Sequence, residues 1–187
     1  ACLAESLARR PALHVTLDPG RGQGVLRKAA ERSGLTPETV LPMNVYACRK
    51  LQPPPLRGRA VIPREEHRPV MAALLRQMAL DAEGQEVPEA AAADFAQAMV
   101  GSDRLLLWED GGIRAMAMIA HIGDGMGRIN TVVTERSRRG RGYAGMLTAA
   151  LCEKLLAQGL TPMLYADAGN PSSNRAYQKI GMEACGQ

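Results

Sequence analysis

The segment Arg138–Gly145, with the sequence RRGRGYAG, holds the residues best suited to bind a ligand. It follows an apolar run, residues 129–134, and precedes residues 143–156, where apolar side chains recur at helical spacing. A glycine-rich loop between a strand and a helix exposes backbone N–H groups at the positive end of the helix dipole. Gly140 and Gly142 let a ligand approach the backbone, and the three arginines add positive charge. The sequence therefore predicts an anion site, for which phosphate is the usual occupant.

The elements that position this loop are predicted from hydrophobic periodicity and from turn residues. From residue 56 the patterns give the order β-α-α-β-β-β-α-β-α. Three antiparallel strands followed by a helical crossover indicate an α/β fold with a mixed, mostly antiparallel sheet flanked by helices. The predicted strands are 56–62, 104–109, 113–122, 128–134 and 163–166, and the predicted helices are 64–83, 89–100, 143–156 and 171–179.

A run of three prolines, Pro53–Pro55, predicts a stiff extended linker and hence a boundary near residue 55. Before it, short apolar pieces alternate with turns that contain glycine or proline. We therefore expect an N-terminal extension at residues 1–55 and the main domain at residues 56–187.

Several classes of function lack their sequence signatures. The four cysteines show no CxxC spacing and the three histidines are scattered, so no metal site is predicted. Neither GxxxxGK[ST] nor GxSxG occurs. Gly140, Gly142 and Gly145 match GxGxxG, but a dinucleotide fold needs that motif in its first βαβ unit.

The charge and the aromatic content bear on partners and compartment. A net charge of +4 suits an anionic ligand, whereas 3% aromatic residues leave little for stacking nucleic-acid bases. No apolar run is long enough to cross a membrane, and the first residues lack the order of a signal peptide. We expect a cytoplasmic protein with no nucleic-acid or membrane partner, as a monomer or a homodimer.

Two motifs together resemble the GNAT superfamily of acyl-CoA N-acyltransferases, over roughly residues 56–187. The phosphate loop of that family, Gln/Arg-x-x-Gly-x-Gly/Ala, is matched by residues 139–144. The family's final helix, Asn-x-x-Ser-Asn-x-x-Tyr-x-x-x-Gly, is matched by residues 170–181, one predicted strand later. The resemblance implies the GNAT fold, and the extension is compatible with a degenerate second GNAT half.

The resemblance also implies a donor site for acetyl-CoA between two diverging strands. Val132, Val133 and Thr134 would form strand-like hydrogen bonds with the pantetheine arm, and Asn170 or Asn174 would bind the same arm. The pyrophosphate would be held by the loop, namely by Arg138, Arg139, Gly140, Arg141, Gly142, Tyr143 and Ala144.

The implied activity is transfer of an acetyl group to a primary amine of a small molecule or peptide in a ternary complex. The backbone N–H of Val132 would stabilise the oxyanion, and Tyr177 would act as the acid toward the thiolate. Where histone-type relatives carry a basic carboxylate, this chain has Arg128. Glu109, at the end of a predicted strand, is the first candidate for the base, and Asp110, Asp124, Glu135 and Asp167 are further carboxylates near the expected site.

Two other functions stay open at this stage. A non-catalytic module of GNAT fold could bind acyl-CoA for regulation, and RSRRGRG could be a nucleic-acid patch. The chain also lacks the usual aromatic residue after Gly181. It reaches Gln187 where a seventh strand is expected, so either that strand is very short or the sequence is cropped. No pattern in residues 64–100 identifies the acceptor amine.

Overall fold

A seven-stranded sheet lies at the centre of the computed structural model, with the strand order β2-β3-β4-β5-β6-β1-β7. The structure describes residues 23–32, 34, 36, 41–55 and 57–186. All neighbouring strands are antiparallel except β5 and β6, which are parallel. The strands are β1 (Met43–Cys48), β2 (Arg59–Val61), β3 (Leu105–Glu109), β4 (Ile113–Gly123), β5 (Met126–Thr134), β6 (Thr161–Asp167) and β7 (Met182–Gly186).

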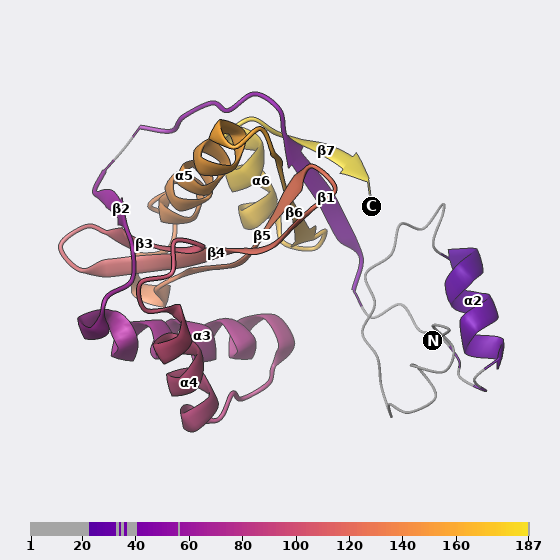
Figure 1. Ribbon diagram of the computed structural model, residues 1–187, viewed down its shortest axis with the longest axis horizontal. Coiled ribbons are helices and arrows are strands. Elements are labelled where there is room, and N and C mark those ends of the chain that lie inside the picture. Colours follow the sequence, from indigo (N-terminus) through magenta and orange to yellow (C-terminus); the bar gives the residue numbers. More distant parts are fainter. Residues whose placement is uncertain (1–22, 33, 35, 37–40, 56, 187) are drawn as a thin grey trace.

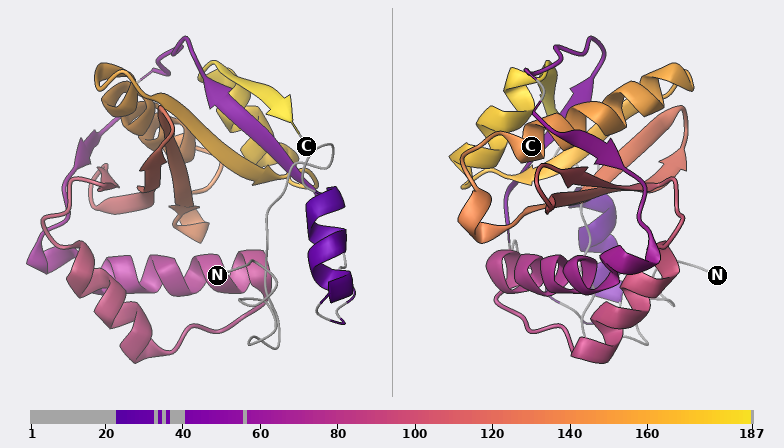
Figure 2. Two further views of the ribbon diagram at one scale, coloured as in Figure 1. Left: turned by 45° about the vertical axis from the view of Figure 1, so that its right-hand side comes forward. Right: turned by 90° about the vertical axis from the view of Figure 1, so that its left-hand side faces the viewer.

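Helices cover both faces of this sheet (Figure 1, Figure 2). Helices α3 and α4 lie on one face and α5 and α6 on the other, which confirms the predicted fold class. The helices are α2 (Gln23–Arg32), α3 (Arg68–Glu83), α4 (Glu89–Met99), α5 (Tyr143–Ala157) and α6 (Pro171–Lys179), with short 3-10 turns at Glu65–His67 and Arg136–Arg138.

Two hydrophobic clusters hold the layers together, because side chains along a strand alternate between the two faces. Leu105 and Leu107 of β3 pack with Met71 and Leu74 of α3. On the other face, Trp108 packs in a cluster that contains most of the buried residues of α5. Each helix layer is therefore attached to the sheet by its own core.

The first helix of the main domain starts in two steps. The acidic pair in Glu65–His67 forms a single 3-10 turn, and α3 then begins at Arg68 with Pro69 in its first turn. Proline is accepted there because its missing N–H would have no partner within the helix. Gly84, in the left-handed conformation, ends the helix.

Strand β1 comes from the predicted N-terminal extension, yet it lies inside the sheet. Tyr46 is opposite Leu164 of β6 in the ladder, and Cys48 is opposite Met182 of β7. The sheet therefore extends across the domain boundary that we expected at residue 55. The seventh strand expected at the C-terminal end is present as the short β7. Residues 1–22, 33, 35 and 37–40 lie outside the described residues, so the likeness of residues 1–55 to a second GNAT half stays a prediction.

The connection from β1 to β2 contains the three prolines and crosses the face that carries α5 and α6 (Figure 1). Hydrogen bonds attach it to the domain on both sides of the prolines. The backbone N–H of Gln52 donates to the carbonyl of Ile180 at 2.9 Å, and the indole N–H of Trp108 donates to the carbonyl of Arg57 at 2.7 Å. The proline segment thus joins two distant strands of one sheet.

Gly181 is a position where the backbone of this connection packs closely against the domain. It has a φ of 87°, and a Cβ there would collide with the backbone of Lys50. Gly159 has a similar φ of 72° with open space around it. Left-handed backbone costs an L-residue about 1–2 kcal/mol. We expect Gly181→Ala to lower the free energy of unfolding clearly more than Gly159→Ala in urea titrations, and equal losses would contradict the docking of the connection.

Candidate functional site

The strands β5 and β6 separate after a short paired region. Their parallel ladder contains only the pairs Met126↔Thr161, Gly127↔Pro162 and Arg128↔Met163. Beyond Arg128, β5 continues against β4, and β6 continues against β1. Each strand is thus supported on its outer side only, and a gap opens between the two inner edges.

A bulge in β5 marks the start of this gap. The register between β4 and β5 shifts between Met116 and Met118, and Thr131 has a positive φ of 53°. A bulge inserts an extra residue, bends the strand and increases its twist. It therefore accounts for the turn of β5 away from β6.

The ladder also determines which backbone groups of β5 face the gap. The N–H of Glu135 donates to the carbonyl of Arg114 on β4 at 2.9 Å. Because hydrogen-bonded and non-hydrogen-bonded pairs alternate in an antiparallel ladder, Val133 also points its backbone groups at β4. Val132 and Thr134 then point theirs into the gap.

This alternation corrects one of the three predicted strand contacts. Val133 is paired with Met116 of β4, and its buried side chain lies in the core beneath α3 and α4. Neither its backbone groups nor its side chain is available to a ligand in the gap. The carbonyl of Thr134 accepts hydrogen bonds from the side chains of Gln77 and Arg139, at 3.0 and 3.4 Å.

The glycine-rich loop lies where β5 ends and α5 begins. Gly140 and Gly142 have φ values of 77° and 85°, which other residues rarely adopt. The first hydrogen bond at the start of α5 runs from the N–H of Met146 to the carbonyl of Gly142. The amides from Gly140 to Gly145 donate to no described residue, so they are available to an anion. The amide of Arg139 instead donates to the carbonyl of Arg136 at 3.4 Å.

The arginines of the loop differ in how far their charges are already balanced. Arg139 and Arg136 both form ion pairs with Asp81 of α3. Hydrogen bonds from these two guanidinium groups lower the pKa of Asp81 to about 2. Arg138 lies 4.0 Å from Glu135, whereas Arg141 forms no ion pair with any described residue.

The first residue of α5 is fixed by its side chain. The hydroxyl of Tyr143 donates to Asp110 at 2.6 Å, and Asp110 also pairs with Arg57 at 2.9 Å. The Tyr143 hydrogen bond is the main cause that lowers the pKa of Asp110. This contact holds the start of the helix against the β3–β4 turn. Ala144 follows it with its amide unpaired.

The two predicted asparagines serve as structural anchors. Asn170 is the N-cap of α6 and accepts from the N–H of Ser173 at 3.1 Å. Asn174 is 8% exposed, and its side-chain oxygen accepts from Asn44 and Tyr46 of β1 at 2.9 and 2.8 Å. Its amide donates to the carbonyls of Asp167 and Asn170. Asn174 therefore ties together β1, β6 and α6.

Tyr177 is buried in the same region. It is 7% exposed, and its ring lies 6.1 Å from the ring of Tyr46. Its hydroxyl forms no hydrogen bond with a described residue. Burial raises the pKa of Tyr177 to about 12, because the phenolate would lose its hydration.

Glu109 lies away from the gap, against its expected role as the base. It stands on β3, with β4 and β5 between it and the gap. Its carboxylate is paired with Arg59 at 2.7 Å. The spacing between strands is about 4.8 Å, so Glu109 is roughly 10 Å from the backbone of β5.

The other carboxylates near the gap mostly have structural partners. Glu135 binds Arg114 and Ser137, and Asp167 accepts from the N–H of Gly169. Arg128 stands on the last paired position before the gap and forms no ion pair with a described residue. Asp124 lies in the β4–β5 turn, at the far end of these strands.

Sequence reasoning missed four residues that shape this site, namely Gln77, Asp81, Asn44 and Tyr46. Each acts on a partner more than 50 positions away, as in the contact from Gln77 to Thr134. Local periodicity carries no signal for such contacts.

The gap and the loop define an α/β protein whose sheet divides beside a glycine-rich turn with amides that donate to no described residue. A family model described as FR47-like protein matches residues 107–187. No curated protein matches the sequence. Within the described residues, no helix has both the length and the apolar character needed to cross a membrane.

Several solved structures are similar to this chain in their fold. An acetyltransferase described as GNAT from Novosphingobium aromaticivorans has a TM-score of 0.57 at 24% identity, covering 79% of this chain and 61% of that one. A GNAT acetyltransferase from Colwellia psychrerythraea has a TM-score of 0.61 at 17% identity, covering 86% and 59%. A ribosomal-protein-alanine N-acetyltransferase from Brucella melitensis has a TM-score of 0.56 at 17% identity, covering 68% and 86%.

These matches confirm the GNAT fold and the resemblance to the GNAT superfamily that its motifs indicated. The chain spans less than two thirds of the length of the first two structures. At these identities the likeness defines the fold, and the chemistry has to be argued from the residues.

The structural role of Asn174 can be tested directly. Asn174→Ala removes the partner of Tyr46 and Asn44 and of two backbone carbonyls, leaving buried polar groups unpaired. We expect a loss of about 3 kcal/mol in the free energy of unfolding, measured by urea titration. Asn130→Ala is the control, because Asn130 is exposed and only accepts from its neighbour Thr131. A loss as small as that of the control would leave Asn174 free for ligand binding.

Proposed function

We propose that the protein is an N-acetyltransferase that moves an acetyl group from acetyl-CoA to a primary amine. One observation carries the proposal: a gap between parallel strands opens beside a loop with unpaired amides. A pantetheine arm needs backbone partners along its length, and a pyrophosphate needs converging N–H donors. This chain offers both next to each other.

In this proposal the donor lies along the inner edge of β5. The backbone N–H groups of Val132 and Thr134 are the donors on that edge. The amides from Gly140 to Gly145, which include those of Arg141, Tyr143 and Ala144, bind the pyrophosphate. Arg141, whose guanidinium forms no ion pair with a described residue, supplies charge from the side.

The chemistry then needs no covalent enzyme intermediate. A neutral amine attacks the thioester carbon, and the N–H of Val132 stabilises the negative charge that develops on the carbonyl oxygen. The attack forms a tetrahedral intermediate with a new C–N bond. When this intermediate collapses, the C–S bond breaks, the amide is left and the CoA thiolate departs. The nitrogen loses one proton to solvent, and the thiolate gains one.

Tyr177 is proposed as a hydrogen-bond donor to the departing thiolate. With its pKa raised to about 12, it stays protonated at neutral pH. In water a phenol has a pKa of about 10 and a thiol a pKa of about 8.5, so full transfer of the phenol proton is uphill by roughly 1.5 units, or about 2 kcal/mol. The proton of the thiol therefore comes from solvent in the end.

The acceptor is proposed to be an amine of low pKa, such as an α-amine. Glu109 is held by Arg59 away from the gap, and Arg128 stands where a carboxylate base would otherwise be expected. Without a base, the amine has to be neutral when it binds. An α-amine with a pKa of about 8 meets this far better at neutral pH than a lysine at about 10.4. The structural neighbour from Brucella is named as an N-acetyltransferase of ribosomal-protein alanine.

The test is release of thiol from acetyl-CoA across a panel of amines matched in size. We expect α-amines to exceed lysine-type ε-amines by roughly two orders of magnitude at neutral pH, following their neutral fractions. The rate with an α-amine should rise with pH up to about 8 and then level off, because only the amine titrates. Tight CoA binding without thiol release from any amine would instead favour the regulatory module.

The variant Tyr177→Phe distinguishes a role of Tyr177 in the chemical step from a role in binding acetyl-CoA. The variant keeps the buried ring and removes the hydroxyl, so the fold should persist. We expect kcat to fall on the order of 100-fold, as for other lost donors to a developing charge. The Kd for acetyl-CoA, measured by calorimetry, should stay within about twofold. An unchanged kcat would remove Tyr177 from the mechanism.

A further inference from the structure

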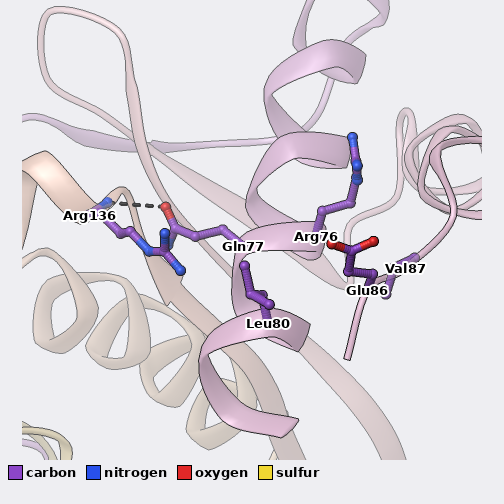
Figure 3. A pocket seen from close by; sticks show the side chains of 6 residues that line it. All are labelled: Arg76, Gln77, Leu80, Glu86, Val87 and Arg136. Carbon is purple, nitrogen blue, oxygen red and sulfur yellow. Dashed lines mark hydrogen bonds between the residues drawn. The ribbon is translucent and has the colours of Figure 1, made fainter. Parts of the chain in front are cut away.

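Helix α3 reaches across to the backbone that leads into the glycine-rich loop. The side-chain amide of Gln77 donates to the carbonyl of Thr134 at 3.0 Å, and its oxygen accepts from the N–H of Arg136 at 3.1 Å. Figure 3 shows Gln77 pointing from the helix toward Arg136, beside a shallow pocket. One turn later, Asp81 forms its ion pairs with Arg136 and Arg139.

These contacts meet a need that the gap creates. The backbone groups of Thr134 point away from β4. On that side β6 has already diverged from β5, so no strand is there to pair with them. A backbone group left unpaired and shielded from water costs free energy. The amide of Gln77 offers a donor and an acceptor as a peptide group does, and it bonds to the end of β5 and to the turn after it as a neighbouring strand would.

The helix that holds both side chains is itself fixed. Gln77 and Asp81 are four residues apart, so they lie on one face of α3. Met71 and Leu74 of the same helix are buried against the sheet. The side chain of Asp81 is 25% exposed and stays ionised, since its pKa is about 2. The contact therefore persists across the neutral pH range.

We propose that Gln77 and Asp81 are positioning residues for the donor site. They hold residues 134–139 in place and so set the direction in which the amides of residues 140–145 point. They contact the loop and not the ligand. This inference rests on the proposed binding of acetyl-CoA, and it makes α3 a support of the phosphate site as well as a layer over the sheet.

The decisive variant is Gln77→Met, which keeps the length of the side chain, removes both hydrogen bonds and leaves the charge unchanged. Gln97→Met on α4 is the matched control, because Gln97 is exposed and makes only a long contact of 3.5 Å with Glu65. Asp81→Asn is the second variant, with Asp94→Asn, an exposed acid on α4, as its control.

We expect Gln77→Met and Asp81→Asn each to raise the Kd for CoA by about tenfold in calorimetry, equivalent to about 1.4 kcal/mol. The double variant should show less than the product of the two effects, because both residues hold one segment. KM for acetyl-CoA should rise with the Kd, while kcat at saturation stays within about twofold. The two controls should match the original protein.

Amide hydrogen exchange without ligand provides a readout that does not depend on the proposed function. Exchange in residues 134–145 should be faster in Gln77→Met than in the original protein, with the C-terminal half of α5 unchanged. If CoA fails to bind the original protein, the proposed function fails, and the exchange measurement still tests the contact. Unchanged exchange, or a Kd for CoA equal to that of the Gln97→Met control, would overturn the inference.

Discussion

The separation of β5 from β6 is the constraint on which the rest of the structure depends. Two parallel strands that part leave backbone N–H and C=O groups without partners, which a folded protein tolerates only where other groups or a ligand replace them. On the outer sides, β4 and β1 continue the ladders of the two strands. At the end of β5, the side chain of Gln77 bonds to Thr134 and to Arg136 in the turn that follows. The edge that is left open is the edge that the proposed function assigns to pantetheine.

The N-terminal strand supports the other side of the gap. Strand β1 pairs with β6 along residues 163–167, which covers the part of β6 that has lost contact with β5. Tyr46 and Asn44 of this strand reach Asn174 on α6. A residue that the family motif assigns to the ligand thus also holds the helix carrying Tyr177 against the sheet. The same contacts therefore complete the sheet and support the site.

Charge at the loop is divided between backbone and side chains. Asp81 already balances Arg136 and Arg139, so the first arginine of the phosphate motif acts on the protein itself. The amides of residues 140–145 and the guanidinium of Arg141 are left for an anion. Backbone donors held by glycine geometry are rigid, whereas an exposed arginine must lose side-chain entropy on binding. This arrangement makes the conformation of the loop more important than the number of its arginines.

Local sequence alone determined the helices and strands between residues 59 and 179, the glycine-rich turn and the resemblance to GNAT proteins. Periodicity and turn residues such as Gly84 and Pro69 act within a few positions, so they can be recognised without the fold. The tertiary structure decided that residues 43–48 enter the sheet, that Glu109 pairs with Arg59 far from the gap, and that Val133 turns its backbone to β4. It also brought Gln77 and Asp81 to the loop. Each of these depends on strand register or on contacts between distant segments, which only the folded chain defines.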